Sequence, residues 1–177
     1  MKITVYTDGS SRGNPGPGGF GIVMFRDDSM EILYAESAKY EDVTNNQMEL
    51  AALLRALDYI EDHYPNDPVT IITDSSYVCK SWNEWMENWA KNNWINSKKQ
   101  VVENLGYMKL LWDYRRRDFF HCSVEHCRGH VGIEGNEYAD MLARGRFKEF
   151  FTDAQEAGYQ ILDYQIINQT NDIVDYV

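Results

Sequence analysis

Two stretches of this sequence end in nearly the same acidic phrase, and they constrain the fold more than any other feature. Residues 2–10 read KITVYTDGS, with the alternation of a β-strand, and residues 69–75 read VTIITDS, a second apolar run. If these strands lie side by side and parallel, Asp8 and Asp74 project together at the edge of the sheet, where open α/β sheets bind ligands. Two carboxylates this close repel each other unless a cation lies between them, so the pattern predicts a metal site.

The size and composition of the chain fit a single globular domain. It has 177 residues, 44% of them hydrophobic and 14% aromatic, which is enough for a sizeable core. No run approaches the roughly 18 consecutive apolar residues of a membrane span. Nothing at the N-terminus resembles a signal peptide, and the three cysteines suit a reducing compartment. We therefore expect a cytoplasmic monomer with no membrane partner.

The charge of the chain argues against one class of partner. The net charge is −11, which taken alone disfavours binding to a polyanion such as a nucleic acid. A nucleic-acid partner would require metal ions and a local cluster of lysine and arginine that outweigh this negative charge within one groove.

The segment between the two acidic strands predicts a loop, a hairpin and a helix. Residues 11–19 (SRGNPGPGG) predict a tight loop. It is either an ordinary hairpin loop or a backbone that approaches a ligand, to which Asn14 can offer its amide. Strands at 20–25 and 30–35 then complete an antiparallel meander with the first strand. Leucines at helical spacing predict a helix over 43–64, which connects the meander to the second acidic strand.

Glu49 stands in the first turn of this predicted helix and has two interpretations. Thr44, Asn45 and Asn46 are good capping residues. Asn46 and Glu49 fit a capping box, in which the carboxylate only satisfies a backbone donor. Alternatively, Glu49 delivers a third carboxylate to the edge of the sheet.

Residues 75–117 predict a long helical region that is unusually rich in tryptophan. Trp85 and Trp89 are one turn apart and share a face. They either pack between helices or form, with nearby lysines, a protruding basic and aromatic handle that grips a phosphate backbone. The lysines are Lys91, Lys98 and Lys99.

The histidines and cysteines of residues 121–128 (HCSVEHCR) raise the alternative of a zinc site. A strand would divide its two histidines and two cysteines between both faces, whereas a tetrahedral site needs all four to converge. We therefore predict a buried fifth strand at this position.

The next segment adds a histidine and a further carboxylate. His130 lies in the glycine-spaced loop 129–135, and Asn136 caps a predicted helix that carries Asp140 in its first turn. Taken singly, the histidine is explained as a solvated side chain, and the carboxylate as a partner of the helix dipole.

Four carboxylates thus stand at strand ends and helix starts. They are Asp8, Glu49, Asp74 and Asp140. Hard oxygen ligands of this kind suit Mg²⁺ or Mn²⁺ rather than zinc. Two such ions about 4 Å apart activate a water and stabilise the leaving oxygen in phosphodiester hydrolysis. Spacing alone leaves open whether the four carboxylates converge.

Five phrases of the chain, in order, resemble type 1 ribonuclease H over roughly residues 1–146. They are YTDGS at 6–10, GNPGPGG at 13–19, TNNQMEL at 44–50, TDS at 73–75 and GHVGIEGNEYAD at 129–140. The resemblance implies the α/β ribonuclease H-like fold: a five-stranded mixed sheet, with an antiparallel meander and then parallel strands, flanked by helices. It also implies an endonuclease that uses two Mg²⁺ ions, with Mn²⁺ as a possible substitute. This enzyme class cuts the RNA strand of RNA–DNA hybrids and leaves 5′-phosphate and 3′-hydroxyl ends.

The resemblance also implies roles for residues of this chain. The metal-binding carboxylates of the family correspond to Asp8, Glu49, Asp74 and Asp140. A flexible-loop histidine that aids proton transfer or product release corresponds to His130. Contacts in the shallow minor groove, which sense the 2′-hydroxyls of RNA, correspond to Asn14, Asn45 and Gln47. Positions near the DNA backbone correspond to Thr44 and Asn46.

Two departures from the family pattern bear on hybrid binding. Ser76 stands where many bacterial members have glutamine, so one minor-groove contact is shortened or absent. Glu84 and Glu87 dilute the charge of the handle. This dilution predicts hybrid binding that is weaker and more sensitive to salt than a basic handle would give.

Residues 147–177 have no counterpart in the resemblance and form a C-terminal extension of the predicted ribonuclease H domain, 1–146. Phe147, Phe150 and Phe151 predict a helix at its start. The acidic, β-forming remainder leaves three roles open: an edge strand, recruitment of a protein partner, or a mobile tail. We expect the extension to be dispensable for the chemistry.

Other classes of function remain as alternatives. A binding module on the same fold would hold nucleic acid without cutting it, and a resolvase or integrase domain would cut DNA. The four carboxylates and the histidine argue against the first, and the phrases GNPGPGG and TNNQMEL argue against the second. We expect Met1, just before the first strand, to be a native start rather than the cut end of a reverse transcriptase.

Overall fold

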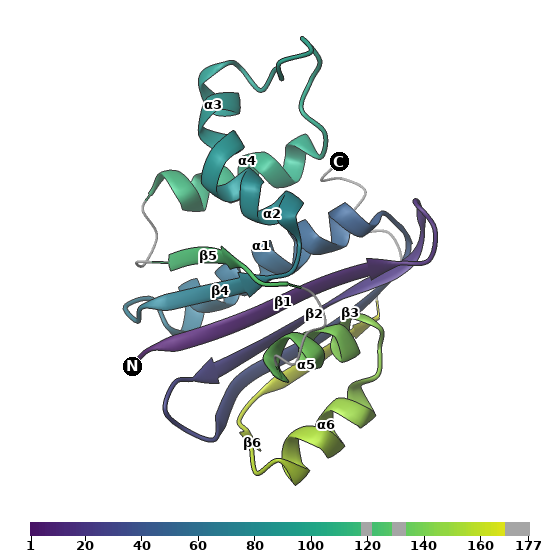
Figure 1. Ribbon diagram of the computed structural model, residues 1–177, viewed down its shortest axis with the longest axis vertical. Coiled ribbons are helices and arrows are strands. Elements are labelled where there is room, and N and C mark those ends of the chain that lie inside the picture. The colour runs from purple at the N-terminus through teal and green to yellow at the C-terminus, as the bar shows by residue number, and fades with distance from the viewer. Residues whose placement is uncertain (118–121, 129–133, 169–177) are drawn as a thin grey trace.

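The computed structural model describes residues 1–117, 122–128 and 134–168, which fold around one mixed β-sheet (Figure 1). Its first strands are β1 (Ile3–Ser11), β2 (Gly16–Arg26) and β3 (Glu31–Val43). They form the predicted antiparallel meander. The glycine-rich loop is shorter than predicted, because residues 16–19 already belong to β2. Glycines pair there because they leave room for neighbouring backbone: a Cβ at Gly19 would lie 2.3 Å from the Ala38 carbonyl oxygen.

The parallel half of the sheet brings the two acidic strands side by side, as predicted. β4 (Val69–Thr73) runs parallel to β1, with Thr73 opposite Thr7. Asp8 and Asp74 are therefore the next residues along two neighbouring strands. β5 (Cys122–His126) runs parallel to β4 on its other side.

The prediction that the fifth strand is buried was wrong. In the sheet order β5-β4-β1-β2-β3-β6, β5 lies at one edge. Of its five residues only Val124 is buried. An edge strand has a neighbour on one side alone, and here Ser123, Glu125 and His126 are exposed while Cys122 is partly buried.

Two helices cover opposite faces of the sheet (Figure 1). α1 (Asn45–His63) buries its apolar stripe against one face, with Leu50, Leu53 and Leu57 in the larger core. α5 (Glu134–Ala143) packs on the other face, where Tyr138 and Leu142 belong to a second core. Each fully buried leucine contributes about 1.5–3 kcal/mol relative to exposure, so these stripes hold both helices against the sheet. None of the described helices is long and apolar enough to cross a membrane.

The tryptophan-rich region is interrupted and is not one continuous helical stretch. It comprises α2 (Ser76–Lys80), a π-helical turn η1 (Ser81–Trp85), α3 (Met86–Lys91) and α4 (Leu105–Arg116). Between α3 and α4 the chain is not helical. Asn93 and Trp94 there have φ values of 56° and 62°, and Asn104 has 56°. Such left-handed residues end a right-handed helix, which periodicity alone does not reveal.

The C-terminal extension adds to the sheet and to the second core. α6 (Phe147–Glu156) begins where predicted, and Phe150 is fully buried against Tyr138. The chain then pairs in parallel with β3 through β6 (Gln160–Ile161) and β7 (Tyr164–Asn168). Within the described residues the sheet thus has seven strands, two more than the family pattern implies. The edge-strand interpretation of the extension is correct for residues 160–168, and residues 169–177 lie outside the described part of the chain.

Candidate functional site

Three of the predicted carboxylates lie together where β1 passes the end of β4. Asp8, Glu49 and Asp74 each contribute a carboxylate oxygen to a cluster in which these atoms lie within 4.8 Å of one another. Asp8 and Glu49 are buried, and Asp74 is half-buried. Oxygens at this spacing are close enough to share a hard divalent cation.

Glu49 reaches the cluster because α1 packs very close to β1. Its Oε1 accepts a hydrogen bond from the backbone amide of Gly9. A Cβ added at Gly9 would lie only 2.4 Å from the Glu49 backbone nitrogen. A residue without a side chain is therefore required at this point of contact.

The capping-box interpretation of Glu49 was wrong. The capping box at the start of α1 joins Thr44 and Gln47. The Thr44 hydroxyl accepts a hydrogen bond from the backbone amide of Gln47 at 3.1 Å. Gln47 Oε1 accepts one from the backbone amide of Thr44 at 2.9 Å. Because the helix begins at Asn45, Glu49 lies in its second turn, beyond the amides that a cap can satisfy.

Burial and mutual repulsion make the cluster unfavourable without a cation. The pKa of Asp8 is raised well above its usual range, first by burial and then by the charges of Glu49 and Asp74. Burial also raises the pKa of Glu49. Glu49 Oε2 is buried and has no hydrogen-bond partner in the described structure. A divalent cation would supply the missing positive charge and the missing partner, so these residues fit a metal.

Asp140 approaches the cluster from α5, on the opposite face of the sheet from α1. Gly21 is paired with Asp8 in the β1–β2 ladder, and a Cβ there would lie 2.3 Å from the Ala139 carbonyl oxygen. The helix therefore packs directly over this pair. The charge of Asp140 adds to the causes that raise the pKa of Asp8. Asp140 Oδ1 is ion-paired with Arg144 Nε at 3.0 Å.

The position of Asp140 in its helix differs from the prediction. α5 begins at Glu134, ahead of the predicted cap at Asn136, so Asp140 lies in the second turn. The helix dipole acts within the first turn and does not account for a carboxylate there. Arg144 is the neighbour that sequence reasoning missed, although its i+4 spacing from Asp140 was a visible signal.

Comparison with known proteins decides the family. The family model described as RNase H matches residues 1–148.

The chain belongs to the ribonuclease H family.

A ribonuclease H from Jannaschia sp. (strain CCS1) is 40% identical over 152 residues, which are 85% of this chain and 94% of that protein. The solved PFV RNase H domain is 28% identical with a TM-score of 0.69, over 81% of this chain and 92% of that domain. A foamy viral protease-reverse transcriptase, solved in complex with an RNA/DNA hybrid, is 27% identical with a TM-score of 0.67. That match covers 85% of this chain and 20% of the viral chain.

Membership of the family confirms the resemblance and the fold that it implied. It also makes this chain a hydrolytic ribonuclease by family. The carboxylate cluster lies within residues 1–148, the matched part of the chain, whereas nearly all of the extension lies beyond it.

The residues expected to contact a hybrid gather around the start of α1. Asn14 Oδ1 accepts a hydrogen bond from the Asn45 amide at 2.9 Å and one from the Ser11 hydroxyl at 3.1 Å. The glycine-rich segment and the helix start are thereby joined into one surface. Asn45 is exposed, and three neighbours are half-buried: Thr44, Asn46 and Gln47. Ser76 is the exposed first residue of α2, two positions after Asp74.

The two tryptophans of the expected handle are half-buried. Their ring centroids, in Trp85 and Trp89, lie 5.6 Å apart. Trp89 packs against the larger core. The core-packing interpretation is therefore correct for Trp89.

The three lysines of the expected handle differ in their surroundings. Lys98 and Lys99 are exposed on the non-helical segment between α3 and α4. Lys91, at the end of α3, is ion-paired with Glu87 at 3.5 Å. The acidic residue thus neutralises one of the three positive charges, as the predicted dilution requires.

On the β5 side of the cluster the structure describes the chain as far as residue 128, so the predicted His130 lies outside the described residues. Cys127 follows β5 as Asp74 follows β4, and its amide donates to the Thr73 carbonyl at 2.9 Å. Burial and then the charge of Asp74 raise the pKa of the Cys127 thiol. Sequence reasoning missed this neighbour of the cluster, which the parallel register of β4 and β5 would have placed.

Proposed function

We propose that this chain is an endonuclease that hydrolyses the RNA strand of RNA–DNA hybrids and leaves 5′-phosphate and 3′-hydroxyl ends. The observation that carries the proposal is the cluster of Asp8, Glu49 and Asp74 on a ribonuclease H fold. The similarity to a foamy viral enzyme solved with an RNA/DNA hybrid supports this choice of substrate.

The cluster has the donor set for two Mg²⁺ ions, with Mn²⁺ as a possible substitute. Asp8, Glu49 and Asp74 would hold them, joined by Asp140. All four donors are hard carboxylate oxygens, the ligands that these cations prefer. When bound, the ions supply activation of a water and stabilisation of the leaving oxygen in phosphodiester hydrolysis.

The contribution of the chain itself is to hold these ligands in place before the substrate arrives. The Gly9 amide orients Glu49 through Oε1, and the register of β1 and β4 holds Asp8 beside Asp74. Arg144 holds the carboxylate of Asp140 in the free enzyme. Ligands that are already oriented need little rearrangement during the reaction, which lowers its barrier. His130, which follows β5 in the sequence and lies outside the described residues, transfers a proton or aids product release.

Recognition of the hybrid is assigned to the surface around the start of α1. Asn14, Asn45 and Gln47 contact sugars and bases in the minor groove, where 2′-hydroxyls distinguish RNA from DNA. The hydrogen bond from the Asn45 amide to Asn14 supports this role, because it holds loop and helix in one fixed geometry. Further contacts, near the DNA backbone and beside Asp74, come from Thr44, Asn46 and Ser76.

The handle, which runs from Trp85 in η1 to Lys99 in the segment after α3, grips the phosphate backbone. Its exposed positive charges include Lys98 and Lys99, and its two tryptophans, Trp85 and Trp89, contact each other earlier along the chain. Lys91 contributes less because Glu87 is its ion-pair partner. On a chain of net charge −11, this modest cluster gives weak binding, whose dependence on salt is set by the number of phosphates that the lysines contact.

A strand-resolved cleavage assay tests the proposal. One sequence is prepared as RNA–DNA, RNA–RNA and DNA–DNA duplexes with each strand labelled in turn, and each duplex is incubated with the full chain and Mg²⁺. We expect cutting of the RNA strand of the hybrid alone. End-specific labelling of the products should detect 5′-phosphate and 3′-hydroxyl groups.

The other outcomes of this assay contradict the proposal and point to the alternative functions. Binding of the hybrid without cutting indicates a binding module. Cutting of the DNA duplex indicates a resolvase-like enzyme. Equal cutting of double-stranded RNA removes the specificity for hybrids.

A further inference from the structure

One buried side chain on α5 has no partner for either of its polar atoms. Asn136 is 1% exposed. Among the side chains that the structure describes, it alone leaves two buried polar atoms, Oδ1 and Nδ2, without a hydrogen bond. Burial of an amide without hydrogen bonds destabilises the fold. The unpartnered amide therefore indicates a group that binds here when the protein is at work.

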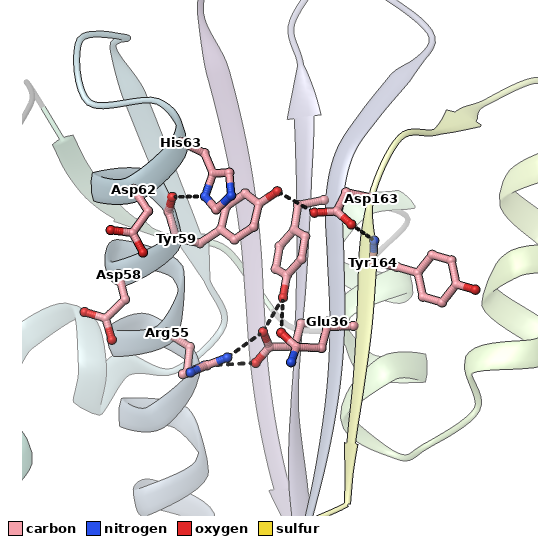
Figure 2. Close-up of a pocket in the computed structure, with 10 residues that line it drawn as sticks. Glu36, Arg55, Asp58, Tyr59, Asp62, His63, Asp163 and Tyr164 are labelled. Atoms are coloured by element: carbon pink, nitrogen blue, oxygen red, sulfur yellow. Dashed lines mark hydrogen bonds and ion pairs between the residues drawn. The ribbon is translucent and has the colours of Figure 1, made fainter.

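A buried polar group with a structural role is satisfied within this chain. Glu36 on β3, which is 2% exposed, lines the hollow between α1 and the C-terminal extension (Figure 2). Arg55 donates to both of its carboxylate oxygens, at 3.2 Å each, and the Tyr34 hydroxyl donates to Oε1. Both oxygens of Glu36 thus have partners, whereas the polar atoms of Asn136 have none.

The start of α5 lies over the strand that carries Asp8. A Cβ added at Gly135 would lie 2.2 Å from two atoms of the Tyr6 ring. Tyr6 and Asp8 are two positions apart on β1, so both side chains point to the face that α5 covers. Asn136 directly follows Gly135. It is therefore in the turn of α5 that packs two residues along β1 from Asp8.

The two flanks of α5 fix the side to which Asn136 points. On one flank Tyr138 packs against Phe150 of α6. In Figure 1, α5 lies between α6 and β1, so its other flank faces β1 and the carboxylate cluster. At 100° per residue, Asn136 is about 160° around the helix axis from Tyr138 and only about 40° from Asp140. Asn136 and Asp140 therefore share the flank that faces the cluster.

Asp140 is the neighbour that this amide can reach. Helical side chains lean toward the N-terminus, so the Asp140 carboxylate is directed toward the turn that carries Asn136, four positions earlier. Amide and carboxylate side chains at this spacing form hydrogen bonds on helices. Arg144, one turn later, is already paired with Asp140 Oδ1 at 3.0 Å. A bond from Asn136 to Oδ2 would hold the same carboxylate from the other side.

We propose that Asn136 is a positioning residue of the carboxylate site, and that its hydrogen bonds are completed when Mg²⁺ is bound. Nδ2 donates to Asp140, and Oδ1 accepts from a water molecule in the hydration shell of the cation. Mg²⁺ keeps several of its waters in protein sites, and partners of this kind orient the ligands of a metal. This inference rests on the proposed function, because it assumes that the carboxylate cluster and Asp140 bind the cation.

Isothermal titration calorimetry of the full chain with Mg²⁺, without nucleic acid, tests the proposal. Asn136→Leu keeps the approximate size of the side chain and removes both polar atoms. We expect its Mg²⁺ affinity to fall about 10-fold. The same variant should raise the Tm of the metal-free chain by about 2–4 °C, because no unpartnered amide remains buried. A purely structural residue would give the opposite result, a lower Tm with unchanged affinity.

Asn136→Asp tests by charge whether the side chain faces the cluster. A carboxylate at this position should bind Mg²⁺ about 3–10-fold more tightly than the amide, and its repulsion of Asp8 should lower the Tm of the metal-free chain. The matched control is Tyr138→Phe, which removes a hydroxyl from the opposite flank, where it donates to Glu134 at 2.6 Å. This control should lower the Tm slightly and leave the Mg²⁺ affinity unchanged.

The outcomes separate this inference from the proposed function. Absence of Mg²⁺ binding and of hybrid cleavage in the unaltered chain would overturn both. Binding and cleavage by the unaltered chain, with the same Mg²⁺ affinity in Asn136→Leu, would overturn the role of Asn136 alone. An affinity that does not rise in Asn136→Asp would overturn it as well, and this second variant decides the question where Asn136→Leu does not fold.

Discussion

The backbone amide of Gly9 donates a hydrogen bond to Glu49 Oε1, across 40 positions of sequence, and this contact assembles the acidic cluster. Asp8 immediately precedes Gly9, so the bond places two buried carboxylates beside each other. The same close approach of α1 and β1 that makes the bond leaves no space for a side chain at position 9.

Gly9→Ala should therefore impair both stability and cleavage. Its methyl group would overlap the backbone of α1, and such overpacking costs about 1–3 kcal/mol or more. The separation of α1 and β1 would move Glu49 away from Asp8, so we expect loss of hybrid cleavage even in the folded fraction. Urea unfolding and a cleavage rate measured well below the melting temperature check the two effects. Ser10→Ala, the adjacent control, should leave both nearly unchanged.

Asp8→Asn should stabilise the metal-free chain at alkaline pH. Because the pKa values of Asp8 and Glu49 are raised on folding, the folded state holds protons that the unfolded state loses above about pH 4. Stability of the metal-free chain then falls as the pH rises from about 4 through neutrality. The substitution removes one of these charges, and we expect Tm to rise by about 3–6 °C at pH 8, and by less at pH 5.

Thermal melts with chelator and with Mg²⁺ check this expectation. Mg²⁺ should raise the Tm of the unaltered chain at pH 8 and have little effect on Asp8→Asn, because ligand binding stabilises only the state that has the site. Asp62→Asn serves as the control for loss of an exposed carboxylate. A metal-free Asp8→Asn chain that melts lower than the unaltered chain at pH 8 would contradict the electrostatic account.

The parts of this site that could be predicted from the sequence are those that depend on local patterns of residues. Asp8 and Asp74 were placed side by side correctly because each follows an alternating run that marks a strand, although β1 continues past Asp8 to Ser11. Glu49 and Asp140 needed the family resemblance, since their approach depends on helix–sheet contacts at Gly9 and Gly21. Those contacts join residues far apart in sequence and leave no periodic signal.

Phe150→Ala should destabilise the chain and leave the chemistry unchanged. Phe150 is fully buried against Tyr138 in the second core, and truncation of a buried phenylalanine costs about 3–5 kcal/mol. It lies beyond the part matched by the family model and far from the carboxylate cluster in sequence. Urea unfolding should show the loss, while the cleavage rate at low temperature stays within about 2-fold. Gln155→Ala, exposed on the same helix, is the matched control.

Truncation of the chain after Lys148 is a more severe test of the prediction that the extension contributes to stability and not to the chemistry. Removal of β6 and β7 exposes the edge of β3, so a lower unfolding free energy is expected with cleavage retained by the folded fraction. A shortened chain that folds but does not cleave would refute the view that the extension is dispensable for the chemistry.

The extension also marks a limit of sequence reasoning. Its helix was predictable from three phenylalanines, but pairing with β3 joins positions more than 120 residues apart, and no local pattern names the partner strand. The non-helical segment between α3 and α4 was missed for a different reason. There, left-handed residues without glycine, such as Asn93 and Trp94, end a stretch of helical composition.

The double variant with Lys98→Ala and Lys99→Ala should bind the hybrid more weakly, and its affinity should depend less on the salt concentration. Both side chains are exposed on the handle, and each phosphate contact contributes about 0.9 to the slope of log K against log salt. Loss of two contacts should reduce that slope by about 1–2. Equilibrium binding from 50 to 200 mM salt checks this, with Lys148→Ala on α6 as the control. A slope that is unchanged in the double variant would show that the handle does not contact phosphate.

The most direct test of the account is the single-turnover rate of RNA cleavage in a labelled hybrid, measured against Mg²⁺ concentration for three chains. These are the unaltered chain, Asp74→Asn, and Asp62→Asn as the matched control. The account predicts cleavage that requires Mg²⁺, that is retained in Asp62→Asn, and that falls by more than about 100-fold in Asp74→Asn. Cleavage that persists with chelator, or that survives in Asp74→Asn at the unaltered rate, would show that the carboxylate cluster is not the site of the reaction.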